Sequence, residues 1–401
     1  MESLAPTILF GAFDRHNFGD LLFPHIVAAL LPGENLIFAG LAERDLRPYG
    51  GHQVRALSQL ALELGNRPAN IFHAGGELLT CDAWQAAVML QAPEQAQAII
   101  ARLDALAAEK QKWAQGMLGI SDLAPYALAR RLFPVAASVV YNGVGGIDLA
   151  SRDARFRTEV EAKLKDADHV GVRDKLTLSC LTAAGIEARL MPDPAVMTAE
   201  LFGEEIRHQA REGETARFLD SLPQGYIAVQ FSADFGDDAT LVEIAAQLDR
   251  VSHETSLGVV FFRAGAAPWH DELDGYQRTA ARMHSPAVKI FSSLHLWDIC
   301  ALLASSRAYC GSSLHGRILA MAFALPRINL RHPAEASANT KQAAYASTWE
   351  APDMPISVEV ANIGQGIRQA MAAEPAALRL TAKALVSRYR REFEVIRAKL
   401  K

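Results

Sequence analysis

The chain has few cysteines, no hydrophobic stretch long enough to cross a membrane and no excess of basic residues. Its four cysteines, Cys81, Cys180, Cys300 and Cys310, are scattered without a C-x-x-C pair, so the sequence indicates neither a disulfide framework nor a zinc site. The longest apolar stretches, such as residues 318–325, are far shorter than the roughly 20 residues of a membrane span. These absences predict a cytoplasmic protein with no transmembrane segment and no metal. Any membrane contact would be peripheral, at the inner face.

The charge balance excludes a broad basic surface. Lysine and arginine together number 40 and aspartate and glutamate 45, which gives a net charge of −5 over 401 residues. A protein that binds nucleic acid usually carries clustered positive charge, so no nucleic-acid partner is expected. The first residues, MESLAP, include an acid where a secretory signal requires positive charge, so no signal peptide is expected. The length is sufficient for two globular domains.

Short β-rich segments alternate with amphipathic or alanine-rich segments along most of the chain. This alternation is typical of parallel sheets joined by crossover helices, so the predicted class is α/β with two Rossmann-like domains. The first series of predicted strands comprises residues 7–10, 36–38, 70–72, 138–141, 170–172 and 188–190, and the second comprises residues 226–231, 258–263, 288–291, 308–310 and 327–330.

A polar segment at residues 200–223 separates the two series and is the expected linker. The expected domains are residues 1–205 and 220–365, followed by a carboxyl-terminal helix at 366–401 that can pack back on the first domain. Residues 82–131 are rich in alanine, leucine and glutamine and predict two or three helices inserted into the first domain. Such an insertion serves packing or self-association, or else a lid on the acceptor side or an element at a membrane surface.

Candidate binding residues in the first half of the chain follow predicted strands, where ligands bind in open α/β sheets. The loop at residues 11–20 matches neither the G-x-G-x-x-G nor the Walker pattern, so it predicts no dinucleotide or nucleoside triphosphate. Asn17 and Asp20 can bind sugar hydroxyls; alternatively, Asn17 turns the chain and Asp20 caps the next helix. Gly75 and Gly76 allow the close approach of a ligand or of another backbone segment.

Two further strand ends carry side chains suited to anions. Ser312 or Ser313 can cap the helix that follows, and the positive end of that helix favours a carboxylate or a phosphate. His315 lies in the first turn of this helix, where catalytic and structural roles are both open. Arg173 suits bidentate binding of a carboxylate or phosphate, or an ion pair at an ordinary capped junction.

Six short motifs in this order resemble the polysaccharide pyruvyl transferase family. The likeness extends over about residues 7–350, and the order of the motifs makes it more specific than any single loop. The motifs are Asn17-Phe-Gly-Asp20, Ala74-Gly-Gly76, Gly143-Val-Gly145, Val172-Arg-Asp174, Asp193-Pro194 and Ser312-Ser-Leu-His-Gly316.

The resemblance implies a two-domain fold of GT-B type and the transfer of an enolpyruvyl unit from phosphoenolpyruvate to a sugar, as a pyruvate ketal. It implies that His315 is the general acid and that Arg173 binds the donor. The expected acceptor side is the first domain, and the expected donor side is the second. The remaining donor-binding residues are expected to be Ser312, Ser313, Gly316, Arg317 and Arg263, and the acceptor-binding residues Asn17, Asp20, Gly75 and Gly76.

One position departs from the family pattern. Many members have an arginine two residues before the motif histidine, where this chain has Ser313. Arg317 can compensate for the missing cation, or the donor differs. Arg263 follows a predicted strand, but the likeness there is loose, and a surface arginine explains it equally well.

The leading hypothesis is a metal-independent pyruvyl transferase of surface-polysaccharide or cell-wall-polymer biosynthesis, with phosphoenolpyruvate as co-substrate and no cofactor. The chemistry requires an acid that protonates the donor's methylene carbon and groups that hold its carboxylate and phosphate. Two alternatives are a GT-B glycosyltransferase that uses a nucleotide sugar and a non-catalytic protein that binds a sugar or an anion. The sequence leaves open the acceptor sugar, whether it is lipid-linked or nucleotide-linked, and whether the chain forms a homo-oligomer.

Overall fold

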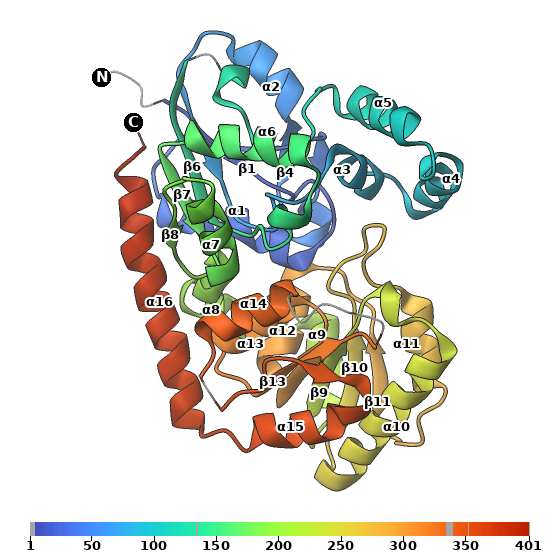
Figure 1. The fold of residues 1–401 in the computed structure, drawn as a ribbon. Helices are drawn as coiled ribbons and strands as arrows, with labels where there is room; N and C mark the ends of the chain where they lie inside the picture. The colour runs from blue at the N-terminus through green and yellow to red at the C-terminus, as the bar shows by residue number, and fades with distance from the viewer. Residues whose placement is uncertain (1–4, 134, 334–339, 352, 401) are drawn as a thin grey trace. The chain divides into compact units, whose positions relative to one another are not determined.

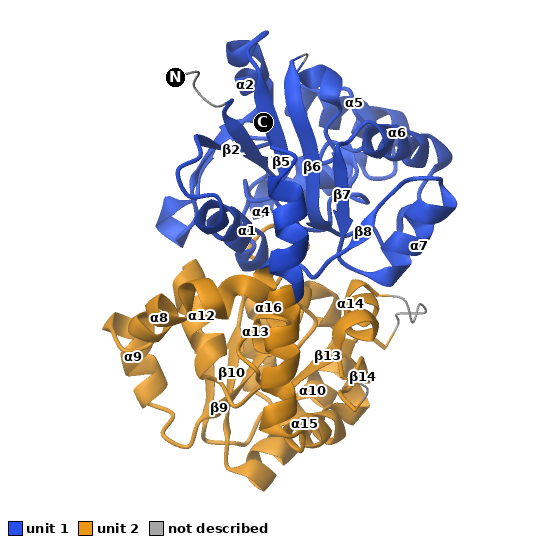
Figure 2. Cartoon of the chain, turned by 90° about the vertical axis from the view of Figure 1, so that its left-hand side faces the viewer, with its two compact units in different colours: residues 1–194, 388–401 blue, residues 195–387 orange. Residues whose placement is uncertain are grey.

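The computed structural model describes residues 5–133, 135–333, 340–351 and 353–400. The chain divides into two compact units, which are coloured separately in Figure 2. Unit 1 comprises Met1–Pro194 and Arg388–Lys401, and unit 2 comprises Ala195–Ser387. Each unit contains its own sheet and its own hydrophobic core.

Unit 1 is built on an eight-stranded sheet in the order β3-β4-β2-β1-β5-β6-β7-β8. Every pairing is parallel except that of β3 with β4. The central strand β1 is apolar and wholly buried, as expected where helices cover both faces of a parallel sheet. The strands are β1 (Thr7–Phe10), β2 (Leu36–Gly40), β3 (Arg44–Asp45), β4 (Gln53–Ala56), β5 (Ala69–His73), β6 (Ala136–Val144), β7 (His169–Val172) and β8 (Arg189–Leu190).

The predicted helical insertion forms three helices at the periphery of unit 1 (Figure 1). Trp84, Val88, Ala96 and Leu103 make a small apolar cluster of their own between these helices. The insertion is α3 (Ala83–Met89), α4 (Pro93–Leu103) and α5 (Ala107–Leu118), and the other helices of the unit are α1 (Phe18–Leu30), α2 (Leu57–Leu64), α6 (Ala154–Lys165) and α7 (Lys175–Ala183).

Unit 2 is built on a six-stranded parallel sheet in the order β11-β10-β9-β12-β13-β14. The strands are β9 (Tyr226–Gln230), β10 (Gly258–Phe262), β11 (Val288–Phe291), β12 (Ala308–Gly311), β13 (Arg327–Arg331) and β14 (Val358–Glu359). The helices that begin and end within the unit are α8 (Thr198–Gln209), α9 (Gly213–Asp220), α10 (Asp238–Thr255), α11 (Leu273–Ala280), α12 (Leu296–Ser305), α13 (Leu314–Ala322), α14 (Lys341–Trp349) and α15 (Ile363–Met371).

The segment at residues 200–223 does not serve as an extended linker, because α8 and α9 occupy most of it. Its polarity reflects helices that bury only a narrow face, such as Gly203 and Ile206 on α8 and Thr215 on α9. The division between the units falls before this segment, at Pro194 and Ala195.

The last helix, α16 (Pro375–Arg397), begins in unit 2, and its final residues belong to unit 1. Tyr389 and Phe393 are buried there. The Tyr389 hydroxyl donates to Asn142 Oδ1 at 3.1 Å, and the Phe393 ring lies 6.1 Å from that of Phe72 on β5. The carboxyl-terminal segment is therefore part of the unit 1 core.

Candidate functional site

The carboxyl ends of β9, β10 and β12 bring candidate residues together at one edge of the unit 2 sheet. β9 lies between β10 and β12, and all three run parallel. Gln230 ends β9, Arg263 follows β10, and Ser312 and Ser313 follow β12. This edge is where open α/β sheets bind ligands.

The amino terminus of α13 carries the predicted histidine. Ser313 is the N-cap residue, and its Oγ accepts the N–H of Gly316 at 3.2 Å. His315 occupies the first turn and is 8% exposed. The positive end of the helix favours an anion at this place.

Gly311 and Gly316 are needed because Tyr309 packs against both. A Cβ on Gly316 would lie 2.4 Å from the Tyr309 ring, and one on Gly311 would lie 2.5 Å from the Tyr309 hydroxyl. The same hydroxyl donates to the carbonyl oxygen of Ser313 at 3.0 Å. Packing against Tyr309 thus accounts for Gly316, which we expected to bind the donor.

Arg317 points into unit 2, and its guanidinium is fully occupied. Nε donates to Glu350 Oε1 at 3.1 Å, and Nη1 donates to Asn329 Oδ1 at 2.7 Å and to the Ile356 carbonyl at 3.4 Å. Nη2 donates to the Pro355 carbonyl at 2.8 Å and lies 3.0 Å from Glu350 Oε1. The side chain is 0% exposed, so all five N–H groups serve the interior of the unit.

Arg263 differs from Arg317 because no described residue forms a hydrogen bond or an ion pair with it. Its Nε atom is buried without a hydrogen bond, and within the described part of the chain the guanidinium forms no hydrogen bond or ion pair. A cation at a strand end with all its donors available is well suited to an anionic ligand.

Three of the six motifs meet around Arg173 in unit 1, together with Glu77, which directly follows a fourth. Its Nη2 lies 2.5 Å from Glu77 Oε2, and its Nη1 lies 3.1 Å from Asp193 Oδ2. A Cβ on Gly145 would lie 2.3 Å from the Glu77 carboxylate and 2.6 Å from Arg173, so a glycine is required for this contact. Arg173 is 2% exposed, and two carboxylates neutralise its charge.

In the amino-terminal motif, Asn17 caps α1 and Asp20 places a buried carboxylate beside it. Asn17 Oδ1 accepts the N–H of Gly19 at 3.1 Å and that of Asp20 at 3.4 Å, as an N-cap side chain does. Asp20 is only 7% exposed; no described residue donates a hydrogen bond to its carboxylate, which interacts electrostatically with Arg15. A Cβ on Gly76 would lie 3.3 Å from Asp20 Oδ1.

Gly75 and Gly76 adopt positive φ angles of 134° and 100°, which favour glycine. A Cβ on Gly75 would also lie 3.0 Å from the Phe23 ring of α1. Backbone conformation and close packing therefore both require these glycines.

Sequence reasoning missed polar residues next to its own candidates. Arg15 donates through Nη1 to the Tyr126 hydroxyl, which in turn donates to Asp14 Oδ1 at 3.2 Å. Burial raises the pKa of Asp14. Arg15 lies two residues before Asn17, and Glu77 directly follows Gly76, so adjacency to a motif was an available signal.

In unit 2 the residue missed is Asp271, in the loop between β10 and α11. Burial raises its pKa to about 7, although Ala264, Gln230 and Gly265 donate hydrogen bonds to it. No sequence pattern singles it out, because its partners are distant in the chain or are backbone groups.

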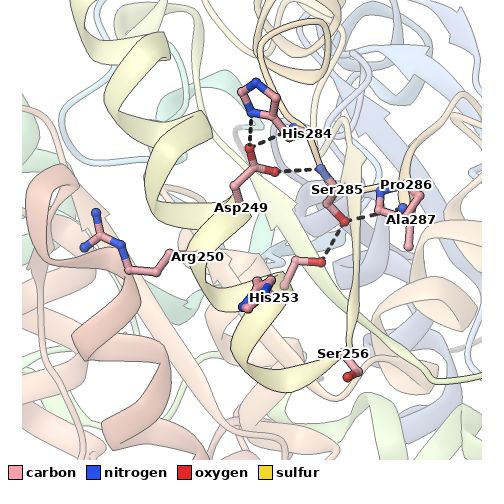
Figure 3. Close-up of a pocket in the computed structure, with 9 residues that line it drawn as sticks. Asp249, Arg250, His253, Ser256, His284, Ser285, Pro286 and Ala287 are labelled. Carbon is pink, nitrogen blue, oxygen red and sulfur yellow. Dashed lines mark hydrogen bonds and ion pairs between the residues drawn. The ribbon is translucent and has the colours of Figure 1, made fainter.

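A separate hollow lies at the opposite end of the unit 2 strands (Figure 3). It has a volume of about 590 Å³ and is lined by the end of α10 and the segment before β11. Asp249 Oδ2 accepts the N–H of His284 at 2.7 Å, and its Oδ1 accepts that of Ser285 at 3.0 Å. The hollow is distinct from the loops at the carboxyl ends of the strands.

Neither a metal cluster nor a membrane span is found in the described residues. No group of three or more histidine, cysteine, aspartate or glutamate side chains there is arranged to hold a metal ion. No described helix is both long and apolar enough to cross a bilayer.

Solved structures with the same fold include UDP-GlcNAc 2-epimerases. UDP-GlcNAc 2-epimerase of Methanocaldococcus jannaschii, in complex with UDP-GlcNAc and UDP, has a TM-score of 0.53 at 12% identity, covering 93% of this chain and 94% of that one. The Neisseria meningitidis UDP-GlcNAc 2-epimerase, bound to UDP-GlcNAc, has a TM-score of 0.52 at 10% identity, covering 96% and 98%. At such identities the likeness establishes the fold alone, which is of GT-B type with two Rossmann-like units.

The sequence comparisons identify the family. No curated protein matches the chain significantly. The family model described as polysaccharide pyruvyl transferase matches residues 119–332, more than half of the chain. The match includes Arg173, Arg263 and His315. The chain belongs to the polysaccharide pyruvyl transferase family.

Proposed function

We propose that the protein transfers an enolpyruvyl unit from phosphoenolpyruvate to a pair of sugar hydroxyls, forming a pyruvate ketal. Family membership supports the reaction class. The products would serve surface-polysaccharide or cell-wall-polymer biosynthesis in the cytoplasm, on a lipid-linked or nucleotide-linked acceptor. The reaction needs phosphoenolpyruvate as co-substrate and no metal or other cofactor.

One observation in unit 2 carries the proposal. His315 stands in the first turn of α13, and Arg263, on the other side of β9, presents a cation that no described residue binds. Phosphoenolpyruvate needs an acid for its methylene carbon and positive groups for its carboxylate and phosphate. Both kinds of group lie at this edge of the sheet.

The proposed reaction begins with proton transfer from His315 to the methylene carbon of phosphoenolpyruvate. This creates a methyl group and an oxocarbenium-like centre at the adjacent carbon. One sugar hydroxyl attacks that centre and loses its proton. Inorganic phosphate then leaves, and the second hydroxyl attacks and loses its proton, which completes the ketal.

We propose that Arg263 and the start of α13 bind the negative charge of the donor. All the N–H groups of Arg317 are occupied by residues of unit 2, and Arg173 lies between Glu77 and Asp193. Arg263 thereby supplies the positive charge that many family members place at the position of Ser313. Ser312 and Ser313 contribute at the helix start, and Arg173 supports the loops around it.

Asp20 is the proposed acceptor-binding residue of unit 1. Its carboxylate is buried, accepts no hydrogen bond within the described chain and lies next to Gly76. Two carboxylate oxygens suit a pair of sugar hydroxyls, and a carboxylate can accept a hydroxyl proton as it is released. Asn17 would hold Asp20 in place by capping α1.

The function is tested by incubating the protein with phosphoenolpyruvate and a panel of sugar acceptors and measuring the pyruvyl mass increment. His315→Gln should abolish the increment while still binding phosphoenolpyruvate in calorimetry. The matched control is His284→Gln, because the side chain of His284 is 94% exposed at the other end of the unit. Full activity in His315→Gln would refute the assignment of the acid.

A nucleotide-sugar glycosyltransferase is the second candidate. The structures with the same fold include complexes with UDP and UDP-GlcNAc, and the start of α13 together with Arg263, which no described residue binds, also suits a diphosphate. Calorimetric binding of a UDP-sugar, with no binding of phosphoenolpyruvate, would favour this candidate. A wild type that binds phosphoenolpyruvate but modifies no acceptor would instead favour a non-catalytic binding protein.

A further inference from the structure

Two side chains, Gln230 and Asp271, connect the loop of Arg263 to the loop of His315. The first loop follows β10 and the second follows β12, with β9 between them. Gln230 is the last residue of β9, and Asp271 precedes α11. Their side chains therefore lie between the two loops to which the donor chemistry is assigned.

The carboxylate of Asp271 divides its two oxygens between these loops. Oδ2 accepts the N–H of Ala264 at 2.5 Å and that of Gly265 at 3.4 Å. Oδ1 accepts Gln230 Nε2 at 2.7 Å. Ala264 directly follows Arg263, so one oxygen fixes the backbone that carries this arginine.

Gln230 extends this hydrogen-bond network to the start of α13. Its Oε1 accepts the N–H of Ser313 at 2.8 Å, and its backbone carbonyl accepts the N–H of Ser312 at 3.1 Å. Because Nε2 faces a carboxylate, the amide is held with Oε1 towards Ser313. Asp271 thus fixes the orientation of the amide that holds the N-cap residue, two positions before His315.

We propose that Asp271 is a positioning residue, which through Gln230 holds the start of α13 with His315 and through Ala264 and Gly265 holds the loop of Arg263. The inference rests on the proposed function, because it concerns the two residues to which acid and donor-binding roles are assigned. It goes beyond that function by naming a group that does not touch the donor and yet aligns both of the groups that do.

The geometry predicts that exchanging the amide and the carboxylate between positions 230 and 271 restores the hydrogen bonds that either single substitution breaks. Above pH 7, where the Asp271 carboxyl is ionised, Asp271→Asn leaves one acceptor where two are needed, because an asparagine that accepts from Ala264 turns its amine towards the amine of Gln230. Gln230→Glu places two carboxylates against each other. In the double variant, the new amide at position 271 can accept from Ala264 and donate to the new carboxylate at position 230. That carboxylate still accepts from Ser313.

The experiment measures kcat and KM for phosphoenolpyruvate in the wild type, both single variants and the double variant, at a pH above 7, where the Asp271 carboxyl is ionised. Each single variant should lower kcat/KM for phosphoenolpyruvate by about 100-fold, the effect of a misplacement of about 1 Å. KM for the acceptor should stay unchanged. The double variant should recover to within about tenfold of the wild type, which loss of stability alone does not predict.

Asp249→Asn is the matched control. Asp249 also holds the N–H groups of a loop in unit 2, but at the opposite end of the strands (Figure 3). It should lose stability without a change in KM for phosphoenolpyruvate. Equal losses of kcat/KM in Asp249→Asn and Asp271→Asn, or no recovery in the double variant, would overturn the inference.

Amide hydrogen exchange separates this inference from the proposed function. The N–H groups of Ala264 and Ser313 should exchange about tenfold faster or more in each single variant and return towards the wild-type rate in the double variant. This pattern in a protein that never uses phosphoenolpyruvate would refute the function and support the connection between the loops. Unchanged exchange in the single variants would refute the connection itself.

Discussion

The three arginines expected to bind the donor have different surroundings, and these separate structural charge from charge available to a ligand. Arg173 and Arg317 are 2% and 0% exposed and are paired with carboxylates. Arg263 has no such partner among the described residues. Sequence position alone could not distinguish them, because all three lie beside strand ends or helix starts.

Replacing Arg173 should cost mainly stability. Arg173→Ala leaves Asp193, which is 0% exposed, and Glu77 without their cation, and removing one partner of a buried pair typically costs about 3–5 kcal/mol. Urea denaturation should show this loss. A variant that stays as stable as the wild type but no longer binds phosphoenolpyruvate would instead make Arg173 a donor ligand.

Replacing Arg263 should lower the affinity for phosphoenolpyruvate and leave the stability nearly unchanged. Because the guanidinium has no protein partner in the described chain, Arg263→Ala should change the free energy of unfolding by no more than about 1 kcal/mol. Affinity for phosphoenolpyruvate should fall at least tenfold, about 1.4 kcal/mol, in calorimetry. Arg282→Ala is the control, since Arg282 binds Asp238 at an exposed site. Undiminished affinity in Arg263→Ala would contradict the assignment.

The stability of the protein should depend on the protonation of Asp271. Burial raises the pKa of its carboxyl to about 7, against about 3.9 in an unfolded chain. Between these values the folded state keeps a proton that the unfolded state has released. The free energy of unfolding should therefore fall as pH rises from about 4 to about 7 and level off above, by roughly 4 kcal/mol from this group.

The difference between the wild type and Asp271→Asn isolates this contribution, because other groups titrate in both proteins. Urea denaturation at a series of pH values should show a steeper fall for the wild type over that range. Parallel curves for the two proteins would mean that Asp271 titrates near its ordinary pKa.

At the level of elements, the cap of α1 tests whether Asn17 serves the helix or the acceptor. Its side chain accepts the N–H groups of Gly19 and Asp20, so Asn17→Ala should cost about 1 kcal/mol in thermal or urea denaturation. Asn17→Ser should restore most of this stability, since serine also caps. If Asn17→Ser is stable but KM for the acceptor rises as in Asn17→Ala, Asn17 contacts the sugar directly.

The sequence predicted the central strands well, because buried parallel strands are apolar and end in glycine or polar loops. All eleven predicted strands are present, from β1 to β13, with small shifts at their ends. Among the described strands it missed β3, β4 and β14, which lie at or next to sheet edges and contain two to four residues, although β8, an edge strand of two residues, was predicted. Such short segments carry no periodic pattern.

The candidate loops could be located from the sequence, but the partners of their side chains could not. The junction at His315 forms a capped helix start, in agreement with its serines. The sequence also left open whether Asp20 caps a helix; the structure gives the cap to Asn17 and leaves the Asp20 carboxylate available. Contacts such as Gly145 with Glu77 and Arg173 depend on the fold and have no local signature.

On the scale of the whole molecule, nearly equal numbers of acidic and basic residues are compatible with the binding of a highly anionic donor. A net charge of −5 offers no broad attraction for phosphate. Under the proposed function, the donor is then bound by local groups, namely the start of α13 and Arg263, to which no described residue binds, and the surrounding low dielectric strengthens each interaction. The expectation that no nucleic acid binds and the proposed use of phosphoenolpyruvate are therefore consistent with each other.

Because α16 begins in unit 2 and ends in unit 1, we expect the stability of unit 1 to depend on the carboxyl-terminal residues. Phe393 is 2% exposed in the core of unit 1, whereas Leu380, on the part of α16 in unit 2, is 70% exposed. Phe393→Ala should therefore destabilise unit 1 by about 3–5 kcal/mol, and Leu380→Ala should change stability by less than about 0.5 kcal/mol.

Hydrogen exchange measured strand by strand can locate this loss. In Phe393→Ala, and more strongly in a chain that ends at Ser387, β5 and β6 should lose protection, because Phe72 and Asn142 lose their contacts with α16. The strands β9 and β10 should keep theirs, since their core lies within unit 2. Equal loss of protection in both sheets would show that the two units unfold as one, and no loss in either would show that unit 1 does not need the segment.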